Sequence, residues 1–203
     1  MKKITKTIEL YQFEELSKEA QEKVIQWYMD DPFRTDIFTD MCNEFYNSEF
    51  PNSELEPHYS LSNCQGDGFN TEGKLLIYEI IDKLKFTDEE KKILHSYYDE
   101  MNNMFTFQSN RQYGYSCKFI DRKCIDEYVE DDVDNLIYYH FPNADSNLIK
   151  RMYEQTFDYF ENLDKQFEED GYKFFYEPNI EEIKECCDAN DYWFTKDGKF
   201  YAE

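Results

Sequence analysis

Glycine and proline are scarce in this sequence, with 6 and 5 copies among its 203 residues. Few positions therefore force turns, and the composition favours regular secondary structure over long loops. No apolar stretch approaches the roughly 18 residues that a membrane-spanning helix needs. The segment from Met1 to Lys6 is polar and basic with no apolar run behind it, which predicts no secretory signal. We therefore expect a soluble protein of the cytoplasm that does not contact a membrane.

The sequence also lacks the short motifs of common catalytic sites. It has no G-x-x-x-x-G-K-[ST], no G-x-S-x-G and no H-E-x-x-H. Its three histidines, His58, His95 and His140, are isolated, and none of the six cysteines forms a C-x-x-C pair. We expect no cofactor, no metal site and reduced thiols, several of them in the core. An enzyme that uses scattered carboxylates in an unfamiliar fold stays as a minor alternative.

Basic residues are outnumbered, with 22 Lys and Arg against 45 Asp and Glu, a net charge of −23. The excess runs along the whole chain and is denser in residues 121–203. Such a surface repels nucleic acid, attracts basic partners and destabilises the compact state by self-repulsion. We therefore expect no direct nucleic-acid binding and a basic protein as the partner. Solubility or adaptation to high salt is the simpler alternative, although 18 Phe and 18 Tyr are unusual for a halophilic composition.

Hydrophobic periodicity predicts several helices with clear start signals. Ser17 is placed to cap a helix with Ala20, Val24, Trp27 and Tyr28 on its inner face, ending before Pro32. A helix at 35–46 should bury Ile37, Phe38, Met41, Cys42 and Phe45. Thr87 and Glu90 form a capping box before a helix with Ile93, Leu94, Tyr97 and Met101 inward. The longest helix should run from Ser146 to about Asp170, with Gly171 as the residue that ends it, and a last helix should cover 180–190.

Turn residues predict strands between these helices. Gln65 to Gly68 and Asp197-Gly198 are typical of tight turns, and 51–57 should be a loop. The expected strands lie at 7–13 (or an extended arm), 59–64, 69–73, 105–111, 115–120, 172–176, 192–195 and 199–201, with helical segments at 75–84 and, in part, 124–140. No repeat or linker marks a boundary. We expect a single α+β domain over 1–203, with several helices packed on a small antiparallel sheet built from hairpins, more helical and more acidic in 121–203.

Rows of carboxylates on the predicted helices are the candidate binding residues. Carboxylates three or four residues apart lie about 5–6 Å from each other on a helix, and duplex DNA carries a charge per roughly 1.7 Å of axis. Such rows can imitate a phosphate track, although a solvated helix face is the simpler explanation for any single row. The predicted partner-binding residues are Glu127, Glu130, Asp131 and Asp134; Glu161, Asp164, Glu168 and Glu169; and Glu181, Glu182 and Glu185, with Asp188 continuing the last row.

Three segments resemble small proteins from phages and prophages of Gram-positive bacteria. The opening from Tyr11 to Lys23 matches the pattern Y-x-F-x-E-L-S-x-E-A-Q-x-K, and Ser60 to Gly68 matches S-x-S-x-x-Q-G-D-G. Ala189 to Gly198 matches the closing pattern A-N-x-Y-x-F-T-x-D-G. Many such proteins carry a loose antitoxin-like description, and acidic members of phage accessory regions include anti-CRISPR inhibitors. The resemblance implies a counter-defence role in the cytoplasm of an infected bacterium.

These observations predict a protein that is not an enzyme and that inhibits by binding. The expected partner is a bacterial protein with a basic nucleic-acid-binding surface, a CRISPR-Cas effector nuclease above all, which the acidic and aromatic surface would contact in competition with nucleic acid. The alternative is an antitoxin-like or regulatory protein that neutralises a basic toxin. The sequence leaves open whether the chain forms a homodimer.

Overall fold

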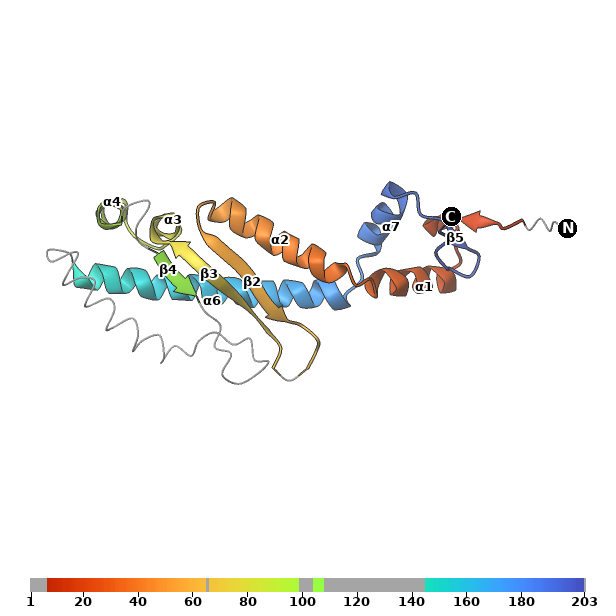
Figure 1. Ribbon diagram of the computed structural model, residues 1–203, viewed down its shortest axis with the longest axis horizontal. Helices are drawn as coiled ribbons and strands as arrows, with labels where there is room; N and C mark the ends of the chain where they lie inside the picture. Colours follow the sequence, from red (N-terminus) through yellow and green to blue (C-terminus); the bar gives the residue numbers. More distant parts are fainter. Residues whose placement is uncertain (1–6, 65, 99–103, 108–144, 203) are drawn as a thin grey trace, which may run out of the picture. The chain divides into compact units, whose positions relative to one another are not determined.

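The computed structural model describes residues 7–64, 66–98, 104–107 and 145–202, and these have an α+β fold (Figure 1). Helices accompany two antiparallel sheets, one of two strands and one of three. The α+β class expected from the sequence is confirmed. The chain divides into two compact units, a finer division than the single domain expected: unit 1 comprises Met1–Ile37 and Tyr172–Glu203, and unit 2 comprises Phe38–Gly171.

Unit 1 joins segments from the two ends of the sequence. Strand β1 (Leu10–Tyr11) pairs antiparallel with β5 (Phe194–Thr195), with Leu10 opposite Thr195. A 3-10 turn, η1 (Phe13–Glu15), leads to α1 (Lys18–Met29), whose first turn is capped as predicted, because the Ser17 hydroxyl accepts from the Ala20 N–H. Helix α7 (Ile180–Ala189) also agrees with its predicted bounds. The core that these elements share consists of Phe13, Leu16, Ala20, Val24, Ile183, Cys187 and Phe194.

A tight hairpin follows β5, where the sequence predicted the Asp197-Gly198 turn. The Thr195 N–H donates to the Lys199 carbonyl at 2.9 Å, and Phe194 forms a bridge with Phe200. Gly198 has a φ of +79°, and a Cβ there would lie 2.3 Å from the Ala20 carbonyl oxygen. Only glycine fits this position, because both the backbone conformation and the close approach to α1 exclude a side chain.

Unit 2 contains the three-stranded sheet, in the order β2-β3-β4, with both pairs antiparallel. The strands are β2 (Glu54–Ser60), β3 (Gly68–Leu76) and β4 (Met104–Phe107). The predicted loop at 51–57 and strand at 59–64 are therefore partly wrong, since β2 begins earlier and ends earlier. Pro57 made 51–57 resemble a loop, but it pairs with Thr71 on an edge strand, where a missing N–H is tolerated.

Helix α2 (Arg34–Glu49) buries only part of the face predicted. Phe38, Cys42 and Tyr46 are buried, whereas Ile37 and Met41 are 47% and 52% exposed. The predicted inner face did not include Tyr46, whose hydroxyl needs a hydrogen-bond partner when the ring is buried. In the structure that hydroxyl lies 2.8 Å from the Thr71 hydroxyl, so the ring can be buried with its polar atom satisfied.

Two short helices lie between β3 and β4 in the sequence. Helix α3 (Ile77–Ile81) is shorter than the predicted 75–84 segment, because Leu75 and Leu76 still belong to β3. Helix α4 (Asp88–Tyr97) begins at the capping box, with the Thr87 hydroxyl accepting from the Glu90 N–H and the Glu90 carboxylate accepting from the Thr87 N–H. Leu94 is buried as expected, but Ile93 is 42% exposed.

Helix α6 (Ser146–Tyr176) is longer than predicted. The sequence placed its end at Asp170, with Gly171 after it and a strand at 172–176, but the helix continues through Gly171. A Cβ at this position would lie 2.4 Å from Leu61 Cδ1 and 2.9 Å from Phe38 Cζ. This glycine therefore allows close packing within unit 2, and the prediction mistook it for a helix end. The predicted helix at 124–140, and most of the predicted hairpin at 105–120, lie outside the described residues.

Candidate binding surface

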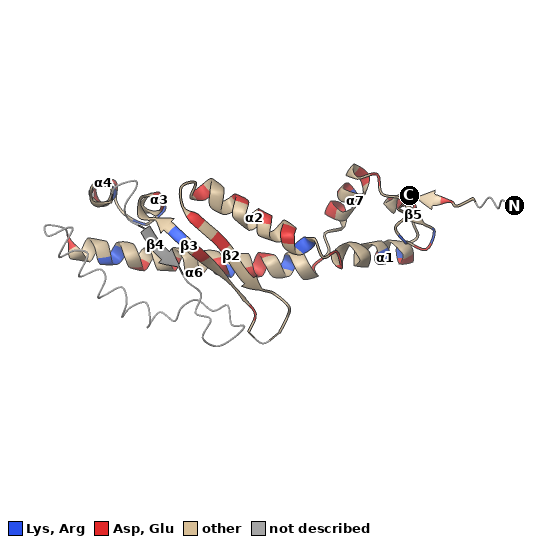
Figure 2. Cartoon of the chain, viewed as in Figure 1, with Lys and Arg blue, Asp and Glu red and all other residues tan. Residues whose placement is uncertain are grey.

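Of the predicted rows of carboxylates, the one on helix α7 is fully described and fully exposed (Figure 2). Ile183 and Cys187, one turn apart, are buried in the core of unit 1 and fix which face points inward. The Asn179 side chain caps the helix by accepting from the Glu182 N–H. The outward face consequently carries four exposed acidic residues: Glu181, Glu182, Glu185 and Asp188. Three of these were predicted as partner-binding, and the fourth continues their row.

The single lysine of α7 is held by a neighbouring element. Lys184 forms an ion pair with Glu14 of η1, and this contact raises the pKa of the Lys184 ammonium, with smaller effects of Asp188 and Glu181. Lys184 therefore does not neutralise the outward row, and negative charge is in large excess on this face. Glu181 and Glu182 lie in the first turn, where the positive end of the helix dipole stabilises negative charge. Asp188 lies in the last turn, where a negative charge is unfavourable.

The second predicted row, on α6, is interrupted because Asp164 is buried. Its Oδ1 accepts hydrogen bonds from the Thr71 N–H at 3.1 Å and from the Thr71 hydroxyl at 2.6 Å. Burial raises the pKa of Asp164 to about 7, although these two hydrogen bonds act in the opposite direction. Asp164 cannot contact a partner from this position, so its prediction as a partner-binding residue is wrong. Carboxylate spacing alone does not show that one member faces a sheet.

The other members of the α6 row do not form a continuous surface. Glu161 is half-buried and pairs with Lys165 at 2.9 Å, which offsets its charge. Glu168 is half-buried and Glu169 is exposed. The third predicted row, Glu127, Glu130, Asp131 and Asp134, lies outside the described residues. Among the predicted rows that the structure describes, α7 is therefore the one that fits a charged binding surface.

Aromatic side chains are partly exposed in the same unit as α7. Trp27 and Phe200 are each 38% exposed and stack with their ring centroids 4.9 Å apart. Tyr192 packs edge-on against both rings, at 5.8 Å from Trp27 and 5.0 Å from Phe200. The sequence placed Trp27 on the inner face of α1, and its helical spacing gave no sign that Phe200, distant in sequence, would stack on it.

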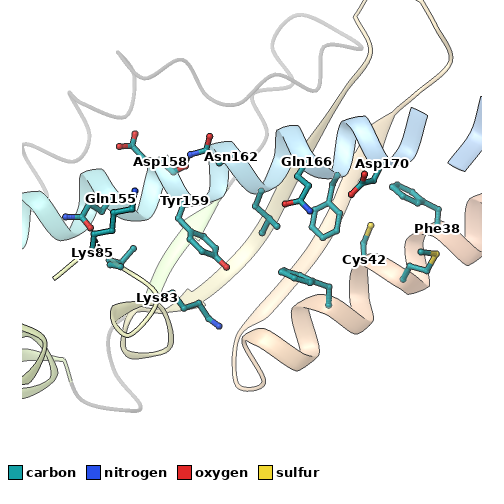
Figure 3. Close-up of a pocket in the computed structure, with 15 residues that line it drawn as sticks. Phe38, Cys42, Lys83, Lys85, Gln155, Asp158, Tyr159, Asn162, Gln166 and Asp170 are labelled. Carbon is teal, nitrogen blue, oxygen red and sulfur yellow. Dashed lines mark hydrogen bonds between the residues drawn. The ribbon is translucent and has the colours of Figure 1, made fainter. Parts of the chain in front are cut away.

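A cavity of about 640 Å³ lies in unit 2 between α2 and α6 (Figure 3). Tyr159 projects from α6 toward Lys83, and Cys42 projects from α2 toward the same cavity. Burial raises the pKa of the Cys42 thiol to about 12, so this cysteine is not activated as a nucleophile at neutral pH. The four cysteines in the described segments, Cys42, Cys64, Cys186 and Cys187, are free thiols.

Within residues 7–64, 66–98, 104–107 and 145–202, no group of three or more His, Cys, Asp or Glu side chains is arranged to hold a metal ion. In the same part of the chain, no helix combines the length and apolar character needed to cross a bilayer. Comparisons with protein-family models, with curated proteins and with solved structures gave no match.

Proposed function

We propose that the protein binds another protein through the acidic face of α7 and thereby blocks a basic surface that handles nucleic acid. The observation that supports this most directly is the orientation of α7, which buries Ile183 and Cys187 and leaves four carboxylates exposed. Like charges at this spacing destabilise a helix slightly. This destabilisation by neighbouring carboxylates is explained if the same carboxylates attract a basic partner.

The spacing of the row supports imitation of a nucleic-acid backbone. With a rise of about 1.5 Å per residue, Glu181, Glu185 and Asp188 lie at axial intervals of about 6 and 4.5 Å. One strand of duplex DNA carries a phosphate per roughly 3.4 Å of axis. The two charge densities are of the same order, so lysines and arginines arranged for a phosphate track would find acceptors on α7.

The exposed aromatic group supplies the second component of a binding surface. Trp and Tyr side chains dominate the binding free energy of many protein interfaces, whereas exposed charges mainly accelerate association. Trp27, Phe200 and Tyr192 belong to the same unit as α7. Together these features favour a salt-sensitive complex with an aromatic contribution that salt does not remove.

The proposed partner is a bacterial nucleic-acid-handling protein, and a CRISPR-Cas effector nuclease is the first to test. The choice of nuclease comes from the resemblance to phage accessory proteins, and the acidic face of α7 is compatible with it. Inhibition would follow from competition with guide or target nucleic acid for the basic channel, in the cytoplasm of an infected host.

The experiment is a pull-down of a Cas effector with tagged protein, followed by a cleavage assay. The test variant neutralises α7 by Glu181→Gln, Glu185→Gln and Asp188→Asn. The matched control neutralises the same number of charges on α6 by Glu161→Gln, Glu168→Gln and Glu169→Gln. We expect the α7 variant to lose retention and inhibition at least tenfold more than the control, and unlabelled duplex DNA to displace the wild type.

Three results would contradict the proposal. Equal losses in both variants would mean that total charge matters and the α7 face does not. Retention that is as strong in high salt as in low salt would remove the electrostatic mechanism. Retention of a small basic toxin from lysate in place of any nucleic-acid enzyme would favour the antitoxin-like alternative.

A further inference from the structure

Arg34 is an unusual residue in unit 1, because its side chain is buried. It opens α2, is 6% exposed, and its guanidinium lies between two aromatic rings, 5.2 Å from the Tyr28 centroid and 4.2 Å from that of Phe174. Its Nη2 donates to the Phe174 carbonyl oxygen. Its Nε is buried and has no hydrogen-bond partner.

No carboxylate of the described segments pairs with this guanidinium, although the sequence has 45 acidic residues. A buried cation is costly when it is unpaired, and contact with aromatic faces offsets only part of that cost. An N–H without a partner adds a further penalty. The arrangement therefore leaves Arg34 with capacity for an anion that the described segments do not supply.

Arg34 also lines a cavity of about 320 Å³ that lies wholly within unit 1. This volume is at the lower end of the range for small-molecule sites. Met29, Pro178 and Ile183 contribute apolar walls. The cavity thus combines a buried cation with an apolar surface, which suits a small carboxylate that carries an aliphatic group.

Two glutamates on the same cavity restrict the charge of such a ligand. Glu177 and Glu182 line it together with the cations Arg34 and Lys173, so the charged groups of the lining balance each other. Burial raises the pKa of the Tyr28 phenol to about 12, and nearby Cys186 and Glu182 raise it further. Arg34 lowers the same pKa, so Tyr28 lies close to both a cation and an anion. A dianion such as phosphate would upset this balance, whereas a ligand with an ammonium group beside its carboxylate keeps it and can contact groups of both signs.

We propose that this cavity binds a small zwitterion, an α-amino acid with an aliphatic side chain, with Arg34 holding the carboxylate and Glu177 and Glu182 facing the ammonium. Guanidinium groups pair well with carboxylates because their N–H donors match the carboxylate geometry. The site shares Glu182 with the acidic face of α7 but does not include Glu181, Glu185 or Asp188. Its test uses no partner protein, so the result does not depend on the proposed inhibition.

The test is an NMR titration of the full chain with three matched probes, read from the Arg34 Nε–H and the Ile183 amide signals. L-Leucine carries both charges, 4-methylpentanoate lacks the ammonium, and leucinamide lacks the carboxylate. We expect saturable shifts with leucine and at least tenfold weaker binding of the other two. Arg34→Lys should weaken leucine binding at least tenfold, because lysine lacks the planar array of donors.

Glu182→Gln provides a second variant at an exposed position, which keeps the proposal testable if substitution of Arg34 prevents folding. It should weaken leucine binding and leave the binding of 4-methylpentanoate unchanged. If leucine produces no saturable shift, the proposal is wrong. If 4-methylpentanoate binds as tightly as leucine, or if Glu182→Gln has no effect, the assignment of the ammonium to the glutamates is overturned.

Discussion

The two units differ in the charge that they bury. Unit 1 buries the cation Arg34 between aromatic rings, whereas unit 2 buries the carboxyl group of Asp164 against Thr71. An arginine remains protonated at all ordinary pH values, but the pKa of Asp164 is raised to about 7 by burial. The difference teaches that the same acidic chain can contain one unit whose buried charge is permanent and another whose buried charge depends on pH.

The largest expected effects come from removing one fully buried ring in each unit. Phe194→Ala in unit 1 and Phe160→Ala in unit 2 should each lower the free energy of unfolding by about 3–5 kcal/mol, since both rings are inaccessible to solvent. Both tryptophans, Trp27 and Trp193, belong to unit 1, so urea unfolding followed by tryptophan fluorescence reads Phe194→Ala there. Far-UV circular dichroism reads Phe160→Ala. A loss below about 1 kcal/mol in either variant would contradict the burial of that ring.

A pH series should separate the units next. The folded-state pKa of Asp164, about 7, lies above the ordinary value of about 3.9, so the folded protein binds the proton more tightly than the unfolded chain. The resulting stabilisation is complete below about pH 4 and is lost as the pH rises to about 7. We expect urea unfolding to show a loss of about 2–3 kcal/mol between pH 5 and pH 8. Asp164→Asn should remove most of this dependence. If Asp164→Asn showed the same dependence of stability on pH as the wild type, Asp164 would be ionised in the folded protein across this pH range.

Two glycines offer a smaller comparison. Gly198→Ala in unit 1 forces a side chain into a positive φ and against the Ala20 carbonyl, so we expect a loss of about 1–3 kcal/mol. Gly171→Ala in unit 2 gains helix propensity but must displace Leu61 and Phe38, and the net loss should be about 1 kcal/mol or less. Thermal unfolding of the two variants measures both. A larger loss for Gly171→Ala would reverse the expected order.

The smallest expected effect concerns the acidic face of α7. Asp188→Asn removes a negative charge from the last turn of the helix and should stabilise unit 1 by about 0.3–1 kcal/mol at low ionic strength. The same change should weaken binding of the proposed partner. Chemical unfolding at low and high salt, with an affinity measurement, tests both expectations. Improved stability together with unchanged affinity would place Asp188 outside the interface.

Local signals predicted much of the fold. The Ser17 cap, the Thr87 capping box, α7 and the final turn all agree with the sequence, because each depends on residues only a few positions apart. The errors occurred where distant residues decide the outcome. Gly171 was interpreted as a helix end because its contacts with Leu61 and Phe38 cannot be seen in the sequence.

The candidate surface was predictable to the same limited extent. The α7 row followed from spacing, since Ile183 and Cys187 indicate which face is buried. Asp164 has the same spacing within its own row, and only the approach of Thr71, 93 positions earlier, shows that it is buried. The cavity beside Arg34 had no sequence signal, because Phe174 lies 140 positions away.

The pairing of β1 with β5 has a consequence for synthesis of the chain on the ribosome. Leu10 cannot form its sheet pair until its partner, Thr195, has been synthesised. At about 5–20 residues per second, this interval is roughly 10–40 s. All of unit 2, which ends at Gly171, is translated within that time. A nascent chain that stalls before β5 would carry unit 2 without the completed core that supports the acidic face of α7.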